Sequence, residues 1–260
     1  MEQKRTFKVV FGTGPLGLAV ARHLLGRGDA VRAVNQSGRA DLPPEVEVMR
    51  ADAANPADAR RVCRGASAVY HCASPPYAKW PQLHPPLMDA IIEGASAAEA
   101  TLVFGDNLYA YGSVDGPLTE DLPYRATGPN GRTRARIAEA LIHAHGRSRV
   151  RAAIARGSDF FGPHARLSTV GDRVFARAIQ GRPAQVLGNP DQPHTVTYLD
   201  DFARALVTLG DTEEALGQVW HVPNPETTTM RRFVETVFET AGHPPRLRAA
   251  PGWASRWAAC

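Results

Sequence analysis

The sequence has 260 residues, of which 43% are hydrophobic and 22% charged, as is typical of a globular protein large enough to bury a sizeable core. No run of about 18 apolar residues occurs, so no membrane span is predicted. The N-terminus runs from a short charged segment directly into an apolar one, which does not match a signal peptide. The net charge of +4 comes mainly from scattered arginines. No basic stripe and no known nucleic-acid-binding motif occurs, so nucleic-acid binding is not predicted.

The cysteines and histidines also exclude some classes of protein. Cys63, Cys72 and Cys260 are the only cysteines, and no Cys-x-x-Cys pair occurs. An odd number of cysteines, without a Cys-x-x-Cys pair, argues against a disulfide framework and favours a reducing, cytoplasmic location. The nine histidines lack the spacing of metal ligands, so no metal site is predicted.

Apolar runs and helical patterns alternate along the first 155 residues. In chain order, the pattern predicts a strand at Phe7–Phe11, a helix at Leu16–Leu25, strands at Ala30–Val34 and Val46–Arg50, a helix at Ala57–Arg64, a strand at Ala68–Cys72, a helix at Leu87–Ala100, a strand at Thr101–Phe104, a helix at Arg132–His145 and a strand at Val150–Ala155. Such alternation predicts an α/β protein of Rossmann type, with a doubly wound parallel sheet.

The chain becomes rich in glycine and proline after Phe160. Helices are predicted there at Leu199–Leu209 and Met230–Ala241, and the region favours a small C-terminal substrate-binding lobe. We expect a nucleotide-binding domain over residues 1–160 and the lobe mainly over 161–260, with 196–222 returning to the first domain. Trp253 and Trp257 suggest an apolar contact surface near the C-terminus.

A glycine-rich turn joins the first strand to the first helix. Its sequence is Gly12-Thr13-Gly14-Pro15-Leu16-Gly17, which matches the G-x-G-x-x-G pattern in its expected context. Gly12 permits the tight turn, Gly14 lets a pyrophosphate approach the backbone, and Gly17 lets the helix pack closely on the strand. The helix N-terminus then favours the anion. The turn predicts dinucleotide binding, with a ligand-free tight turn as the alternative.

The segment after the second strand predicts which dinucleotide is bound. A site that prefers NAD carries an acidic residue here for the ribose 2′-hydroxyl, and this sequence has the uncharged Asn35. Ser37 and Arg39 can contact a 2′-phosphate, so we expect NADP rather than NAD, unless Arg39 is only a solvated loop residue. Asp52, followed by Ala53, is placed either to meet the adenine or to cap the next helix.

Several further segments resemble the NAD-dependent epimerase/dehydratase family, in the extended or atypical branch of the short-chain dehydrogenases/reductases. They are Val69–Ala73, Tyr109-Ala110-Tyr111-Gly112, Arg156–Pro163 and Tyr198–Arg204. The resemblance implies a Rossmann domain with a small substrate lobe, and hydride-transfer chemistry on a sugar nucleotide or another carbonyl compound. It also places Ala73, Ser74 and Gly157 beside the cofactor. The family resemblance is compatible with a homodimer.

The chain departs from that family at the catalytic residues. Lys4, Lys8 and Lys79 are its only lysines, and none follows a tyrosine by four residues, so the family's Tyr-x-x-x-Lys pair is absent. By resemblance, Asn130 stands in place of the tyrosine, and Arg134 replaces the lysine and can bind the nicotinamide ribose. Asn107 stands in place of the serine. The Asn130 amide cannot serve as a general base.

Three functions remain open from the sequence. The first is an oxidoreductase or epimerase in which another residue, such as Tyr109, Tyr111, Tyr77 or Asp106, supplies the proton. The second is a non-redox isomerase, cyclase or lyase that uses the same pocket. The third is a redox-silent regulator that binds NADP. Substrate contacts are expected from Tyr77, Asp159, Phe160 and His194, with Phe160 as a wall of the pocket. Tyr77 could instead cap the core, and His194 could be a surface residue.

Overall fold

The computed structural model describes residues 6–250, and the chain divides into two compact units. The first unit comprises Met1–Gly157 and Asp200–Val222, and the second comprises Ser158–Leu199 and Pro223–Cys260. Trp253 and Trp257 lie outside the described residues. No helix within residues 6–250 is long and apolar enough to cross a membrane.

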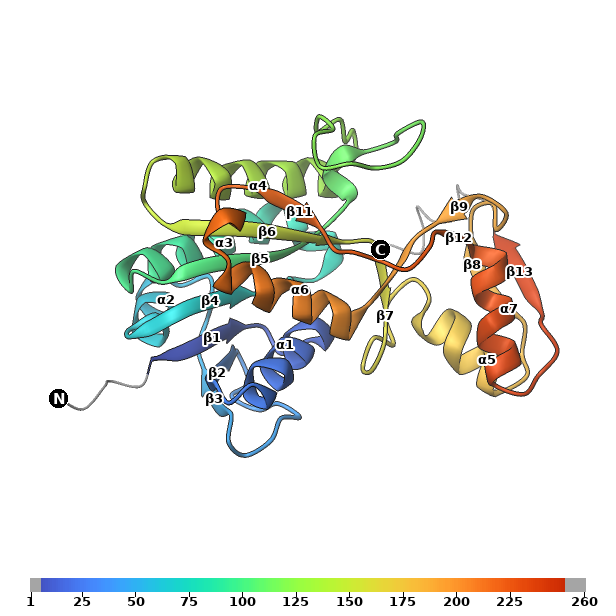
Figure 1. Ribbon diagram of the computed structural model, residues 1–260, viewed down its shortest axis with the longest axis horizontal. Helices are drawn as coiled ribbons and strands as arrows, with labels where there is room; N and C mark the ends of the chain where they lie inside the picture. Colours follow the sequence, from blue (N-terminus) through green and yellow to red (C-terminus); the bar gives the residue numbers. More distant parts are fainter. Residues whose placement is uncertain (1–5, 251–260) are drawn as a thin grey trace. The chain divides into compact units, whose positions relative to one another are not determined.

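The first unit contains a sheet of seven parallel strands (Figure 1). Its order is β11-β6-β5-β4-β1-β2-β3, with bounds β11 (Val219–His221), β6 (Arg151–Gly157), β5 (Thr101–Asn107), β4 (Ala66–His71), β1 (Phe7–Phe11), β2 (Ala30–Asn35) and β3 (Glu47–Arg50). The chain runs outward from β1 through β2 to β3 and then crosses to β4 on the other side of β1, so the strand order reverses between β1 and β4. The predicted doubly wound parallel sheet is therefore confirmed, and its switch point lies at the carboxyl end of β1.

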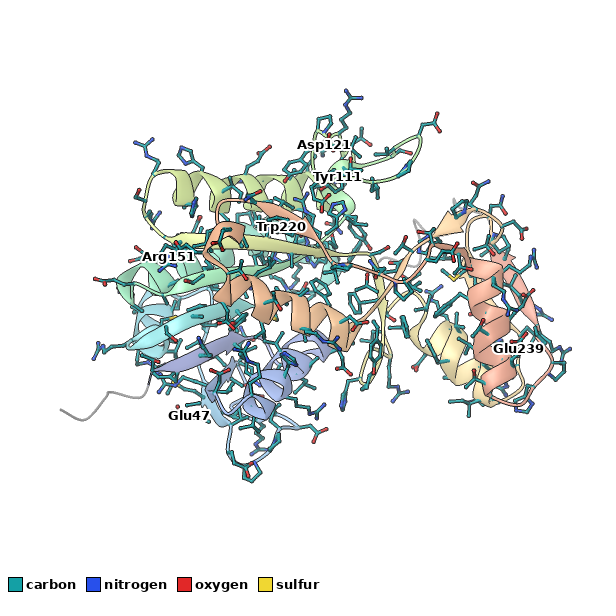
Figure 2. The ribbon with its side chains drawn as sticks, in the orientation of Figure 1. Glu47, Tyr111, Asp121, Arg151, Trp220 and Glu239 are labelled. Atoms are coloured by element: carbon teal, nitrogen blue, oxygen red, sulfur yellow. The ribbon has the colours of Figure 1, made fainter. Side chains whose placement is uncertain are left out.

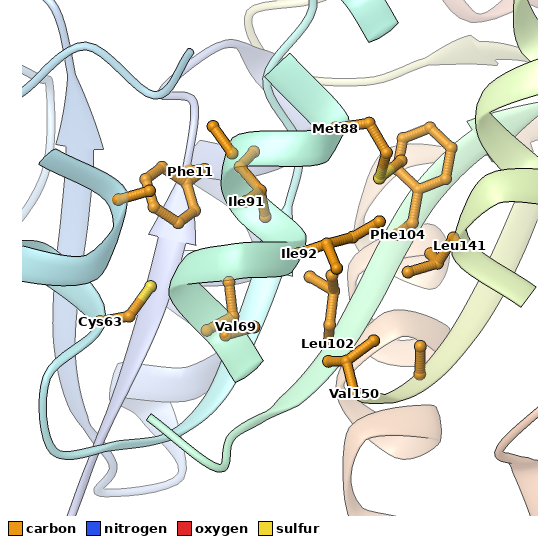
Figure 3. Packing of buried hydrophobic residues seen from close by; sticks show 14 of the residues in the cluster. Phe11, Cys63, Val69, Met88, Ile91, Ile92, Leu102, Phe104, Leu141 and Val150 are labelled. Atoms are coloured by element: carbon orange, nitrogen blue, oxygen red, sulfur yellow. The ribbon is translucent and has the colours of Figure 1, made fainter. Parts of the chain in front are cut away.

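Helices cover both faces of this sheet, because successive side chains on each strand point to opposite faces. Val9 and Phe11 of β1 pack in a core with helices α2 (Pro56–Cys63), α3 (Trp80–Ala97) and α4 (Pro129–Gly146). Figure 3 shows part of this core, where α3 lies over β1, β4 and β5. Val10 of β1 packs in a second core with helices α1 (Pro15–Gly26) and α6 (Leu199–Asp211).

Helix α3 begins seven residues earlier than the sequence predicts. It starts at Trp80 rather than Leu87, and it continues through Pro85 and Pro86. Each proline removes a backbone donor from the helix, at a penalty of about 3 kcal/mol relative to alanine. Burial of Trp80 and Met88 on the same helix offsets that penalty, because both side chains are almost completely inaccessible to solvent.

The structure also differs from the sequence-based prediction in the start of one other helix and in several short elements that were not predicted. Helix α4 begins at Pro129 rather than Arg132, so its first turn includes Asn130. The short helices η1 (Tyr77–Lys79), η2 (Tyr109–Tyr111) and η4 (Glu213–Ala215) and the edge strand β11 were not expected. Strand β11 is only three residues long and forms because β6 provides a parallel partner.

The second unit has a small core of its own. Strands β7 (Asp159–Phe161) and β10 (Val196–Tyr198) are parallel, as are β8 (Ala184–Leu187) and β13 (Leu247–Ala250). Strands β9 (Pro193–His194) and β12 (Thr228–Thr229) pair in antiparallel fashion. Helices η3 (Gly171–Ala176), α5 (Arg177–Ile179) and α7 (Met230–Thr240) complete the unit. Phe161, Phe175 and Phe233 pack ring against ring beside its buried aliphatic core.

Candidate active site

The glycine-rich turn lies at the carboxyl end of β1, where the strand order reverses. Gly12 has a φ of +92°, which a residue with a side chain rarely adopts, and an added Cβ would lie 2.6 Å from the Cα of Ala73. An added Cβ on Gly17 would lie 1.9 Å from the carbonyl oxygen of Gly12. These two glycines are therefore required by the packing of the turn itself.

Gly14 differs from the other two glycines because it faces open space. It is the N-cap of α1, with Pro15 and Leu16 following in the first turn, and no side chain caps the helix. An added Cβ at Gly14 would meet no other atom within 4 Å. The N-terminus of α1 thus has N–H groups that no side chain caps and the positive end of the helix dipole, which is suited to a pyrophosphate.

The loop after β2 is held closed by its own polar side chains. The Asn35 amide donates to the Oγ1 atom of Thr13 at 2.6 Å and to the carbonyl oxygen of Arg39 at 2.8 Å, and it accepts from the Gly38 N–H at 2.6 Å. The Ser37 hydroxyl lies 3.1 Å from both Asn35 Oδ1 and the Arg39 carbonyl. Asn35 and Ser37 therefore shape the loop, and the Arg39 side chain is exposed.

A second arginine lies beside this loop. An added Cβ on Gly38 would lie 3.0 Å from the Cβ of Arg50, so the end of β3 and the loop are in contact. The Arg50 side chain is exposed, as is that of Arg39. Arg50 was not predicted as a site residue, and its position at the end of the predicted strand Val46–Arg50 was the only available signal.

The segment after β3 rules out one of the two roles that the sequence left open for Asp52. The N-cap of α2 is Asn55, whose side chain accepts from the N–H groups of Ala57 and Asp58. Asp52 therefore does not cap that helix; its carboxylate accepts from the Ala54 N–H at 3.1 Å in a local turn, next to the half-buried Ala53. The Asp52 side chain is exposed at the carboxyl edge of the sheet.

The small residues expected near the cofactor lie at the same edge. Ala73 follows β4 and contacts Gly12, and the neighbouring Ser74 is exposed. Gly157 ends β6 opposite Asn107 of β5, and an added Cβ there would lie 2.6 Å from the ring of Phe202. The carboxyl ends of β1, β4, β5 and β6 thus meet at one edge.

A buried ion cluster lies next to this edge. The Asp106 carboxylate accepts from Arg134 at 3.2 Å and from Arg156 at 3.0 Å, and its side chain is completely buried. Two arginines and one aspartate leave an excess of one positive charge. Arg134 Nε and Arg156 Nη1 are buried without a partner among residues 6–250. Removing the carboxylate would leave two uncompensated charges, so the cluster must form as a unit.

Aromatic rings surround both arginines. The Arg134 guanidinium lies 4.2 Å from the ring centre of Trp80. The Arg156 guanidinium lies 4.8 Å from that of Tyr111, which is labelled in Figure 2. Burial lowers the pKa of Arg134, against the opposing attraction of Asp106 and Tyr109. Burial also disfavours the charge on Arg156, but attraction to Asp106 and two tyrosines leaves its pKa above the ordinary value.

Two buried histidines lie close to Arg134. The ring of His71 stacks on Phe104, and the ring of His84 meets Trp80 edge-on. None of their four ring nitrogens has a hydrogen-bond partner among the described residues. Burial, with the nearby Arg134 charge, lowers the pKa of His71 to about 3 and that of His84 to about 2. Both rings therefore remain neutral and are unsuited to donating protons.

The residues that are expected to stand in place of the catalytic triad make contacts of their own. The Asn130 amide donates to the Tyr77 carbonyl oxygen at 3.2 Å, and Asn107 Oδ1 accepts from the Tyr109 N–H at 3.0 Å. Arg134 is bound to Asp106 and is almost completely buried. The structure therefore brings Tyr77, Tyr109, Asn130 and Arg134 together at one place in the first unit.

The predicted substrate residues of the second unit form a separate pair. His194 Nε2 lies 3.0 Å from Asp159 Oδ2, and Thr169 donates to Asp159 Oδ1 at 3.1 Å. Phe160 lies opposite Thr197 in the β7–β10 ladder. Within residues 6–250, no group of three or more His, Cys, Asp or Glu side chains could hold a metal ion.

Comparisons with known proteins agree with this arrangement. An uncharacterised UDP-glucose epimerase, YtcB, of Bacillus subtilis is 22% identical over 143 residues, covering 55% of this chain and 45% of the relative. The structure of UDP-glucose 4-epimerase from Thermus thermophilus, in complex with NAD, matches with a TM-score of 0.80 and 20% identity, covering 95% of this chain and 86% of that one. UDP-glucuronic acid 4-epimerase from Bacillus cereus, also with NAD, matches with a TM-score of 0.83 and 17% identity, covering 95% and 88%.

The match to the curated relative spans less than half of its length, and the similar structures establish the fold alone. The family is established by a longer match. A sequence profile of the NAD dependent epimerase/dehydratase family matches residues 9–222, from the first strand to the last strand of the parallel sheet. This chain belongs to the NAD dependent epimerase/dehydratase family.

Proposed function

We propose that this chain is an NADP-dependent oxidoreductase or epimerase that acts on a sugar nucleotide or another carbonyl-containing small molecule. The observation that carries the proposal is Gly14, which leaves the N-terminus of α1 open at the switch point of the sheet. Ligands of open α/β sheets bind at this point, outside the carboxyl ends of the strands. When bound, the nicotinamide cofactor supplies or accepts a hydride.

The preference for NADP over NAD rests on the loop after β2. Residues 35–39 carry no carboxylate, which an NAD site uses to accept from the ribose 2′-hydroxyl. Arg39 and Arg50 instead place two exposed cationic side chains beside that loop. Arginine binds phosphate through paired, charge-assisted hydrogen bonds, so both are suited to a 2′-phosphate. The similar structures from Thermus thermophilus and Bacillus cereus contain NAD. The preference for NADP is therefore a feature of this chain's own loop.

The proposed reaction uses a site without the usual Ser/Tyr/Lys triad. The amides of Asn107 and Asn130 can orient a substrate oxygen, but neither titrates in a useful range. Arg134 retains a positive charge at the position of the lysine, and its contacts with Asp106 and Trp80 fix where that charge lies. The chain therefore provides orientation and positive charge, and it needs another group for proton transfer.

The second unit supplies further proposed substrate contacts. Asp159 follows Gly157 by two residues, so the chain leads from the carboxyl end of β6 directly into the Asp159–His194 pair. The bond to Asp159 fixes which nitrogen of His194 carries a proton and which faces away. Within the second unit, the pair and Phe160 offer polar and aromatic contacts to a substrate.

The experiment that tests the function is NADPH oxidation in the presence of a panel of carbonyl compounds and UDP-sugars. Gly14→Val places a side chain in the open space at the N-terminus of α1, where its Cβ meets no other atom within 4 Å, and we expect it to abolish turnover. Gly26→Ala, at the other end of the same helix, also meets no atom within 4 Å and serves as the matched control. Equal turnover in both variants would contradict the proposed cofactor site.

A further inference from the structure

Asn35 lies where the end of β2 meets the glycine-rich turn and the end of β3. The Ala51 N–H donates to its carbonyl oxygen at 2.9 Å, and the Gly12 N–H donates to that of the preceding Val34 at 2.9 Å. Its side chain is partly buried, whereas Arg39 in the following loop is exposed. The backbone of Asn35 is therefore fixed on both sides, next to a loop that forms no strand of its own.

The side-chain amide of Asn35 uses all of its hydrogen-bonding capacity within the protein. One hydrogen of Nδ2 goes to Thr13 Oγ1 at 2.6 Å, and the other goes to the Arg39 carbonyl oxygen at 2.8 Å. Oδ1 accepts from the Gly38 N–H at 2.6 Å and lies 3.1 Å from the Ser37 hydroxyl. An asparagine has two amide hydrogens and two acceptor positions, so this amide keeps none for a nucleotide ribose.

The two backbone partners determine the orientation of this amide. A carbonyl oxygen can only accept and a peptide N–H can only donate, so Nδ2 faces Arg39 and Oδ1 faces Gly38. A carboxylate in place of the amide would set one of its oxygens against the Arg39 carbonyl oxygen, and the two would repel each other. The bond that holds the Arg39 backbone therefore requires an amide rather than an acid.

Two further features connect this loop to the glycine-rich turn. Gly38 has a φ of +70°, which a residue with a side chain rarely adopts, and it reverses the chain so that Arg39 returns to Asn35. Thr13 belongs to the glycine-rich turn, and its bond to the Asn35 amide ties that turn to the loop. The turn at the N-terminus of α1 and the Arg39 backbone thus share one anchor.

We propose that Asn35 is a positioning residue for cofactor choice. It holds the Arg39 backbone so that the arginine side chain meets the 2′-phosphate, and it does not contact the ribose itself. This inference rests on the proposed binding of NADP. A long side chain binds a phosphate best when its backbone is already fixed, because the freedom of an unfixed loop would be lost on binding. Asn35 therefore acts on the nucleotide through Arg39.

Trypsin cleavage after Arg39, followed by mass spectrometry of the fragments, tests the loop without a nucleotide. The bond that trypsin cuts includes the carbonyl group that Asn35 holds, and a held loop must open before a protease can cut it. We expect Asn35→Ala and Asn35→Asp to be cut there at least about fivefold faster than the wild type, since neither has a donor for that carbonyl. The matched control Asn55→Ala removes an amide that caps α2, and we expect it to leave this rate unchanged. Equal rates in the wild type and in both Asn35 variants would overturn the inference.

Titrations with NADPH and NADH, followed by fluorescence, test the role of Asn35 in cofactor choice. We expect Asn35→Ala to bind NADPH about tenfold more weakly and NADH almost as well as the wild type, because NADH has no 2′-phosphate for Arg39 to meet. In a chain that already carries Arg39→Ala, the same substitution is expected to cause no further loss, since both changes remove one interaction. Asn55→Ala is expected to keep the preference of the wild type.

The outcomes separate this inference from the proposed function. A wild type that binds neither nucleotide, or that prefers NADH, would refute the proposed NADP site and with it the role of Asn35 in that site. A wild type that prefers NADPH, with an Asn35→Ala variant that keeps this preference or loses both nucleotides equally, would overturn the inference alone. Losses that add in the double variant would show that Asn35 does not act through Arg39. If Asn35→Ala does not fold, Asn35→Asp lacks the same donor and takes its place in both experiments.

Discussion

Acid is expected to destabilise this protein through His71 and His84. Both rings are completely buried, without hydrogen-bond partners among residues 6–250, and their pKa values are about 3 and about 2 in the folded state. The ordinary value for a histidine is 6.5. The folded state therefore keeps both rings neutral at mildly acidic pH, whereas the unfolded chain takes up a proton at each. The stability is present above pH 6.5 and is lost as the pH falls toward the folded-state values.

The size of the effect follows from these values. At about pH 5, each histidine favours the unfolded state by about 2 kcal/mol, because one pH unit corresponds to about 1.36 kcal/mol. The two residues together remove about 4 kcal/mol, a large part of the roughly 5 to 15 kcal/mol that is typical of a folded domain.

Urea unfolding at about pH 7.5 and about pH 5, followed by circular dichroism, measures this loss. The double variant His71→Leu, His84→Leu keeps apolar side chains of similar size and removes both protonation sites. We expect the wild type to lose about 4 kcal/mol more than the double variant on acidification. If both proteins lose the same free energy of unfolding, the histidines are not buried as neutral groups and the reasoning is refuted.

Three other substitutions test the site. Arg39→Ala is expected to weaken NADPH binding about tenfold or more, with little effect on NADH, and equal losses in parallel titrations would contradict the 2′-phosphate assignment. Asp106→Ala leaves Arg134 and Arg156 as uncompensated buried charges, and we expect a loss of about 3 to 5 kcal/mol in urea unfolding; a change below about 1 kcal/mol would show that the cluster is not needed. Gly17→Ala places a Cβ 1.9 Å from a backbone oxygen of the same turn. We expect a lower unfolding temperature, and an unchanged one would show that the turn relaxes easily.

The features that sequence predicted well are those with local causes. The strand–turn–helix at Gly12–Gly17 follows from Gly12 and Gly17, where an added Cβ would collide with the backbone, and β1 and β2 follow from short apolar runs. The parallel sheet was predictable from the alternation of strands and helices. The family resemblance was confirmed because its motifs extend over most of the sheet.

Features that depend on distant partners were not predictable. The start of α3 at Trp80 depends on burial of its side chain, which outweighs the prolines. Strand β11 exists because β6 pairs with it. The sequence aligned Arg134 with a catalytic lysine, but it could not show that Asp106 is shared with Arg156, fifty residues away from it in the chain. Local residue types likewise left the cap of α2 open as one of two roles for Asp52, whereas the structure uses Asn55.

The most direct test of the account is an equilibrium titration of the purified chain with NADPH and with NADH, followed by fluorescence. We expect NADPH to bind and NADH to bind at least about tenfold more weakly, because Arg39 and Arg50 flank the loop that would hold the 2′-phosphate. A chain that binds neither nucleotide would contradict the central claim, since the open N-terminus of α1 would then hold no dinucleotide.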